Sequence, residues 1–199
     1  EFGCRGDHVI VSSKIPNRSS SSSLSKRKPY GLNKISVENT FHSVYIGSHS
    51  KCIRDLKISG EDPDLVLTVG FDKKIVLTKM SAKLSVLEFS TPKKIWSCTW
   101  EKDSKHLFYA GCEGGQIGQY DTRKPKGAVK HFWIPSKKPI HSLACIDVAE
   151  CRQGLLAASY DGAFLNFAQN QPENTGSWCR IGNSVGDIQA AVNSANYDP

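Results

Sequence analysis

Apolar residues in this 199-residue chain occur in short runs that are rich in β-branched and aromatic side chains. The runs are four to six residues long, and examples lie at 41–46, 65–69, 75–78 and 106–110. None is long enough, or periodic enough at about 3.6 residues, to predict a helix. Turn-forming residues punctuate the runs, as in Gly70-Phe71-Asp72, Gly114-Gly115 and Asp161-Gly162. The pattern therefore predicts an all-β fold of short strands joined by tight turns.

One motif recurs three times along the chain. Segments that start at Ile53, Ile95 and Ile140 align without gaps, and their starts lie 42 and 45 residues apart. Each is followed by a polar turn, a second apolar strand that ends in small residues, a tight turn and a third strand. This period and order resemble the WD40 repeat, which has about 40–45 residues and four strands per blade. Stacking such blades buries the apolar surface that a single blade leaves exposed.

The repeats predict a WD40 β-propeller, with a partial ring of about three to four blades in this chain. Tyr120 and Phe167 suit the aromatic position at the end of the third strand, whereas Thr78 does not. His49 ends a Gly-Ser-His run that is similar to the Gly-His element of such repeats. A β-sandwich with regularly spaced strands is the alternative. Blade strands are predicted at 31–48, with repeats at 49–90, 91–135 and 136–168.

Composition changes at both ends of the chain. Residues 1–30 include a Ser-rich and basic insert, which predicts a flexible segment. Residues 169–199 are polar and rich in Asn, Gly and Ala, which predicts a loosely ordered tail. Since a seven-bladed ring needs roughly 300 residues, we expect the chain to be part of a larger ring.

Charge and cysteine content narrow the class of protein. The net charge of +7 permits an acidic partner without identifying one. The seven cysteines are odd in number and form no C-x-x-C pair, which argues against a zinc site and a disulfide framework and favours reduced thiols in the cytosol or nucleus. No apolar run has the length of a membrane span. No catalytic triad, carboxylate pair or phosphate loop is visible, so we expect no catalytic residue, metal, cofactor or direct nucleic-acid site here.

Several runs together resemble one WD40 domain in particular. They are Tyr45-Ile46-Gly47-Ser48-His49 continuing to Leu56, Ile95-Trp96-Ser97-Cys98-Thr99-Trp100, Phe108-Tyr109-Ala110-Gly111 and Tyr120-Asp121-Thr122-Arg123. Over residues 31–167 the chain resembles the C-terminal WD40 domain of the RING finger and WD repeat domain-containing E3 ubiquitin-protein ligase family. The W-S-C-x-W run and the Y-A-G…Y-D-x-R runs are specific in combination.

The resemblance implies a nuclear ubiquitin ligase that acts in DNA damage repair, at replication forks and interstrand crosslinks, with the cytoplasm as a second location. In such proteins a RING recruits the ubiquitin-charged conjugating enzyme, and the propeller binds substrates or adaptors, notably replication protein A. The cysteines of this chain lack the paired spacing of a RING, so zinc and transferase activity are expected only in a RING elsewhere in the polypeptide. The alternative function is a non-enzymatic WD40 scaffold without a ubiquitin role.

Partner-binding residues are predicted from the repeat. In propellers the residue after the first apolar position of the first strand often points to the partner-binding face, and Arg and Trp are frequent in binding hot spots. The residues predicted to bind a partner are Arg54, Trp96 and His141, with Lys51, Lys94 and Lys138 nearby. Tyr120, Asp121 and Arg123 are similar to a W-D-x-R signature that docks cullin-4 ligase adaptors. The alternative interpretation is that Asp121 and Arg123 close the turn after the third strand.

Overall fold

The structure is a computed structural model of the chain. It describes residues 2–5, 8–15, 28–38, 43–102, 104–148, 152–167 and 178–181. Most of the Ser-rich insert and most of the C-terminal tail lie outside these ranges, so the predictions of a flexible insert and a loosely ordered tail are untested there.

The described residues form four antiparallel sheets of four strands each, with no helix among them. The first sheet contains β1 (Phe2–Arg5), β2 (His8–Lys14), β3 (Tyr30–Ser36) and β4 (Ser43–His49). The second contains β5 (Ile53–Ile58), β6 (Leu65–Gly70), β7 (Lys74–Lys79) and β8 (Leu84–Ser90).

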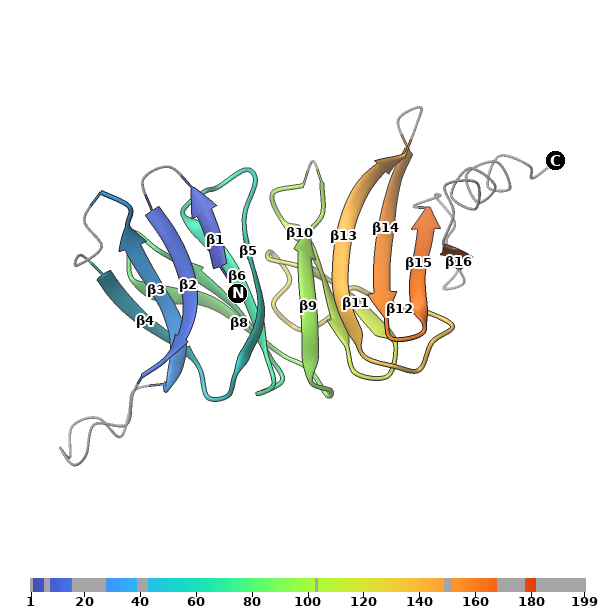
Figure 1. Cartoon of the computed structure of the whole chain (residues 1–199), viewed down its shortest axis with the longest axis horizontal. Coiled ribbons are helices and arrows are strands. Elements are labelled where there is room, and N and C mark those ends of the chain that lie inside the picture. Colours follow the sequence, from blue (N-terminus) through green and yellow to red (C-terminus); the bar gives the residue numbers. More distant parts are fainter. Residues whose placement is uncertain are drawn as a thin grey trace. The chain divides into compact units, whose positions relative to one another are not determined.

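The other two sheets repeat this plan (Figure 1). The third contains β9 (Ile95–Trp100), β10 (Leu107–Cys112), β11 (Gln116–Asp121) and β12 (Lys130–Trp133). The fourth contains β13 (Ile140–Val148), β14 (Arg152–Ser159), β15 (Gly162–Phe167) and β16 (Trp178–Ile181). In every sheet the spatial order of the strands follows their order along the chain, so each sheet is an antiparallel meander. The prediction of an all-β fold is confirmed.

The chain divides at the start of β9 into two compact units, each made of two sheets. The core of the first unit takes side chains from both of its sheets, among them Leu32, Ile46, Leu56 and Val66. The core of the second unit does the same, with Ile117, Ile140, Leu155 and Phe164 among its members. Neither sheet of a pair can cover its inner face alone, so packing one sheet on the other provides each unit with its core.

The recurring isoleucines occupy equivalent places, as the repeat predicts. Ile53, Ile95 and Ile140 each begin the first strand of a sheet, namely β5, β9 and β13. Their side chains are 6%, 0% and 0% exposed. The period seen in the sequence is therefore the period of the sheets.

The first and last sheets extend beyond the limits that the sequence suggested. Residues 2–14 supply β1 and β2 to the first sheet, whereas the blade strands were predicted to begin at 31. Trp178–Ile181 supply β16 to the fourth sheet, beyond the predicted limit at 168. The short run Val9-Ile10-Val11 is too brief to stand out in the sequence, yet Ile10 is buried in the first core. These strands form because they pair with neighbouring strands of the sheet, and amino-acid composition does not reveal such pairing.

Neighbouring sheets of the second unit approach closely at Gly111 in β10. A Cβ atom at Gly111 would lie 2.6 Å from Ser97 Oγ and 2.8 Å from Ile140 Cγ2, both shorter than ordinary contacts. Beside it, the Ser97 hydroxyl donates a 2.7 Å hydrogen bond to the Ile140 carbonyl, which links β9 to β13. Glycine is therefore required at this position so that the two sheets can pack.

Replacement of Gly111 by Ala should destabilise the chain by about 1–3 kcal/mol, because the added methyl group overpacks the contact with β13. The measurement is the free energy of unfolding in urea. Gly60→Ala is the matched control, since no atom lies within 4 Å of the Cβ that it would add. An equal effect of the two substitutions would show that backbone entropy, and not the close approach, sets the requirement at Gly111.

Candidate partner-binding site

In the second sheet, and separately in the fourth, two connecting segments meet at one end of the sheet. Strand pairing places Ile53 opposite Gly70 and Ile140 opposite Ser159. The start of each first strand therefore lies beside the turn between the second and third strands. In the second sheet this turn contains Phe71, and in the fourth sheet it contains Tyr160.

Arg54 and His141 lie at β-bulges in equivalent positions. In the second sheet the pairing passes from Ile53↔Gly70 to Asp55↔Val69, which leaves Arg54 as the extra residue. In the fourth sheet it passes from Ile140↔Ser159 to Ser142↔Ala158, which leaves His141 as the extra residue. A bulge interrupts the alternation of side chains and re-aims the extra one, and bulges are frequent next to functional sites. The structure thus gives both predicted residues a backbone feature that the sequence does not reveal.

In the first unit two cations converge on one aromatic ring. The guanidinium carbon of Arg54 lies 5.2 Å from the centroid of the Phe71 ring, and Lys94 Nζ lies 5.9 Å from the same centroid. Both distances are within the range of a cation–π contact. Lys51 is exposed in the turn before β5, and Lys94 is exposed in the connection before β9. The three predicted basic residues of this unit therefore lie at one end of the second sheet, Lys51 and Lys94 in the connections and Arg54 at the start of β5.

In the second unit three rings form an aromatic cluster. Trp96 and His141 meet edge to face with centroids 4.9 Å apart, and His141 meets Tyr160 in the same way at 5.6 Å. Tyr160 is 85% exposed, although a ring of this size is usually at least half covered. Lys138 is exposed in the connection before β13, where its backbone N–H donates a 3.1 Å hydrogen bond to Ser136 Oγ. Trp96 and His141 are thus brought together, and Tyr160 joins them.

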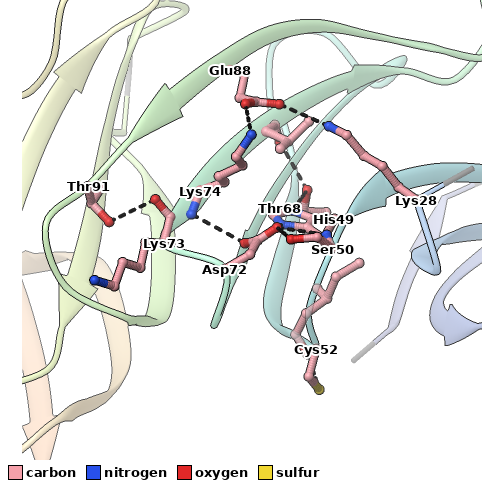
Figure 2. A network of polar contacts seen from close by, with 12 residues as sticks. Lys28, His49, Ser50, Cys52, Thr68, Asp72, Lys73, Lys74, Glu88 and Thr91 are labelled. Atoms are coloured by element: carbon pink, nitrogen blue, oxygen red, sulfur yellow. Dashed lines mark hydrogen bonds and ion pairs between the residues drawn. The ribbon is translucent and has the colours of Figure 1, made fainter. Parts of the chain in front are cut away.

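A buried polar network holds the turn that carries Phe71 (Figure 2). His49 Nδ1 lies 2.9 and 3.0 Å from the two carboxylate oxygens of Asp72, and Nε2 lies 2.9 Å from Thr68 Oγ1. The backbone N–H of Ser50 donates to Asp72 at 2.9 Å. The side chains of His49 and Asp72 are 0% and 2% exposed. The network fixes the turn against the connection between β4 and β5, and thereby fixes the position of Phe71.

Hydrogen bonds to Asp72 overcome the effect of its burial. Burial alone raises the pKa of this carboxyl group, but the hydrogen bond and charge of His49, with the N–H groups of Ser50 and Lys74, hold the pKa below its usual range. The three side chains together resemble a catalytic triad in their connectivity only. Thr68 is 0% exposed and donates its hydroxyl hydrogen to the Val76 carbonyl at 3.1 Å. The hydroxyl is therefore out of reach of a substrate, and the role of the network is structural.

The fourth sheet has a simpler counterpart of this network. The Ser136 hydroxyl donates a 2.6 Å hydrogen bond to Asp161, which lies next to Tyr160 in the turn between β14 and β15. An Arg180 guanidinium NH₂ donates to the Asp161 carbonyl, also at 2.6 Å. Asp161 thus corresponds to Asp72, and each anchors the turn that carries the aromatic residue of its own sheet.

Tyr120, Asp121 and Arg123 lie at the end of β11 and in the following turn. The Tyr120 ring is buried and stacks on Phe108 with centroids 5.3 Å apart. Arg123 donates to Asp121 from Nε at 3.0 Å, from a terminal NH₂ at 2.8 Å and from its backbone N–H at 2.9 Å. These are the contacts of the alternative interpretation, in which the pair closes the turn. Adaptor docking stays a prediction.

Comparison with known proteins decides the family. A sequence model described as the E3 ubiquitin-protein ligase RFWD3 WD40 domain matches residues 8–176. The chain belongs to this family. Its four sheets are therefore four blades of a WD40 propeller, and the predictions of the fold and of the family are confirmed.

Individual relatives agree with this assignment. The E3 ubiquitin-protein ligase RFWD3 of Mus musculus is 30% identical over 143 residues, which are 71% of this chain and 18% of the relative. The protein of the same name from Ailuropoda melanoleuca is 29% identical over 143 residues, again 71% and 18%. That of Homo sapiens is 33% identical over 103 residues, which are 52% of this chain and 13% of the relative. The chain thus spans less than a fifth of the length of these relatives.

Some features of the site in this RFWD3-type WD40 domain were missed in the sequence. The sequence pattern marks Phe71 only as a turn residue and does not mark Tyr160, although both follow the small residue that ends a second strand. Asp72 was assigned to the turn without its partner His49. The order Gly-Ser-His followed by Asp in the next tight turn is the signal that would have found this pair. Within the described ranges, no group of His, Cys, Asp or Glu is arranged to hold a metal, and no helix qualifies as a membrane span.

Replacement of Asp72 by Ala should cost about 2–4 kcal/mol of unfolding free energy, because His49 and the Ser50 N–H lose a buried partner. Asp72→Asn should separate the contribution of charge. Since the pKa of Asp72 is lower in the folded state, that contribution is present above about pH 4 and disappears as the pH falls through the folded pKa. Urea unfolding across this pH range measures it, with Glu113→Gln in the exposed turn of the third blade as the control. A difference between the wild type and Asp72→Asn that is independent of pH would contradict this account.

Removal of the Arg123 side chain should raise the pKa of Asp121 from about 2 toward 3.8, because the side-chain hydrogen bonds from Arg123 are the largest cause of the depression. Carboxyl-carbon NMR titration of Arg123→Ala measures the change. Lys124→Ala is the control and should have a much smaller effect, since Lys124 acts only through its charge. An unchanged pKa in Arg123→Ala would show that the contacts of Arg123 do not persist in solution.

Proposed function

We infer that this chain is the partner-recognition module of a RING-type E3 ubiquitin-protein ligase, and that it binds its partners through Arg54, Trp96 and His141. The observation that carries the proposal is the pair of equivalent bulges at Arg54 and His141. Each bulge places a predicted binding residue against an aromatic residue of the neighbouring turn, Phe71 in one unit and Tyr160 in the other. The same bulge thus recurs at the same strand position in two blades, and bulges are frequent next to functional sites.

The chemistry of these residues suits a protein partner. Tyr, Trp and Arg dominate the binding energy of protein interfaces, because they combine a large contact area with a polar group. Tyr160 offers an exposed ring that is supported from the side by His141, so little conformational entropy is lost when a partner covers it. WD40 blades are rigid, which favours partner binding without a change in the platform.

We propose ligase activity for the whole polypeptide of which this chain is a part. The names of the relatives and the family match support ubiquitin transfer, with zinc and the conjugating-enzyme site in a RING outside this chain. The resemblance supports a nuclear protein, also cytoplasmic, that acts in DNA damage repair at replication forks and interstrand crosslinks. Replication protein A and ubiquitination substrates are the proposed partners. The chain itself contributes recognition and no catalytic residue.

Combined replacement of Trp96 and Tyr160 by Ala should weaken binding to the cognate replication protein A by about tenfold or more, which corresponds to about 1.4 kcal/mol or more. Titration calorimetry with the 199-residue chain measures the affinity. Trp133→Ala is the matched control, because Trp133 is 52% exposed on the outer strand β12 of the same unit. Tyr160→Ala alone should retain the wild-type melting temperature, since its side chain is almost fully exposed.

Unchanged affinity in the Trp96 and Tyr160 variant would exclude this cluster as the binding site. If neither variant nor wild type binds replication protein A, the choice of partner is wrong. Ubiquitin transfer by the complete polypeptide, reconstituted with a conjugating enzyme, decides between a ligase and the alternative of a WD40 scaffold without a ubiquitin role.

A further inference from the structure

The loops at one end of the second sheet carry an excess of positive charge. These loops, called the basic end below, comprise residues 49–54, 70–74 and 91–95. They contain six basic side chains, namely Lys51, Arg54, Lys73, Lys74, Lys93 and Lys94, and a single carboxylate, Asp72. Such an imbalance in three adjoining loops creates a positive potential that attracts an anionic partner.

Asp72 does not neutralise this charge toward the solvent. Its carboxylate is 2% exposed and is engaged by His49 and by the N–H groups of Ser50 and Lys74. Outside the loops, Glu88 of β8 pairs with Lys74 and with Lys28, as Figure 2 shows. Asp72 and Glu88 are thus already engaged, whereas Lys51, Lys73, Lys93 and Lys94 are exposed.

The loops of the basic end are held in place before any partner arrives. Thr91 is held in one position, because its N–H and its hydroxyl both donate to the Lys73 carbonyl, at 2.8 and 3.1 Å. The hydroxyl also lies 2.7 Å from the Lys93 carbonyl. Since these bonds join the connection before β9 to the turn before β7, the lysines of both loops project from a fixed backbone. A fixed array of charges binds with a smaller entropic cost than a mobile one.

We propose that the basic end binds an acidic peptide segment of a protein partner, with Asp and Glu side chains on the lysines and on Arg54. This proposal names the chemistry of one partner and rests on the proposed function of partner recognition. The extended backbone of such a segment spaces its carboxylates by about 3.3 Å per residue, so a few residues reach across neighbouring loops. Charge complementarity of this kind speeds association and selects the partner.

The aromatic residue at the basic end favours a peptide over single-stranded nucleic acid. Proteins that bind single strands stack bases on open aromatic faces within a basic groove. Here Arg54 and Lys94 both lie within cation–π distance of the Phe71 ring, and the ring is only partly exposed. The ring thus serves to position two cations, and base stacking would have to displace them.

The experiment measures binding of a fluorescein-labelled peptide of about twelve residues, composed of Asp, Glu and Ser, to the 199-residue chain. Fluorescence anisotropy should show binding that weakens as NaCl rises from about 50 to about 200 mM. Combined Lys51→Glu and Lys94→Glu substitution should reduce the affinity at least about tenfold. Lys83→Glu is the matched control and should leave the affinity unchanged, because Lys83 is exposed in the turn between β7 and β8, at the opposite end of the same sheet.

Three results would overturn the proposal. They are equal binding of a peptide with Asn and Gln in place of Asp and Glu, an equal loss of affinity in the Lys83 variant, and tighter binding of a thymidine oligonucleotide of similar length through the same lysines. If the double variant fails to fold, amide chemical-shift changes in the unmodified chain decide the matter. The peptide should shift the signals of Lys51, Phe71 and Lys94, and shifts elsewhere would contradict the proposal. The effect of the Trp96 and Tyr160 substitutions on partner binding does not depend on whether the acidic peptide binds. The two proposals can therefore be contradicted independently.

Discussion

Close packing of neighbouring sheets is the constraint on which the rest of each unit depends. A four-stranded sheet of this size cannot bury its own apolar face, and it becomes stable only when a second sheet covers that face. In the second unit the approach is so close at Gly111 that the backbone of β10 lies against Ile140 of β13. Ile140 directly precedes His141, which is the extra residue at the bulge of β13.

The polar network of His49, Asp72 and Thr68 has a different task. It stabilises the turn between β6 and β7 with groups that would be costly to bury singly. Because every member has a partner, the network can be buried without an unpaired charge. The turn then fixes the position of the Phe71 ring, and the ring in turn helps to position Arg54 and Lys94 beside it. Structural polar groups thus lie inside the blade, while basic side chains surround its end.

This arrangement agrees with the proposed role of the module in protein recognition. The two units present different surfaces, one basic and one aromatic, through the same bulge in two blades. When the same bulge recurs with a different side chain, similar repeats can present binding surfaces of different chemistry. A rigid platform of this kind matches the role proposed for the propeller of a ubiquitin ligase, which holds a substrate while ubiquitin is transferred elsewhere.

The sequence by itself determined the fold class, the repeat period and the family, because each depends on short local patterns of residues. The isoleucines at 53, 95 and 140 recur at the spacing of a blade, and the tight turn between the second and third strands of each repeat contains Asp or Gly. It also singled out Arg54, Trp96 and His141 as candidate binding residues from their place in the repeat. It did not reveal β1, β2 and β16, because their short apolar runs acquire meaning only through pairing with distant strands. Only the tertiary structure decided that Arg54 and His141 lie at β-bulges and that Phe71 and Tyr160 contact them. It also decided that Asp72 pairs with the buried His49. Those facts depend on register and on packing between segments far apart in the chain, which no local pattern of residues encodes.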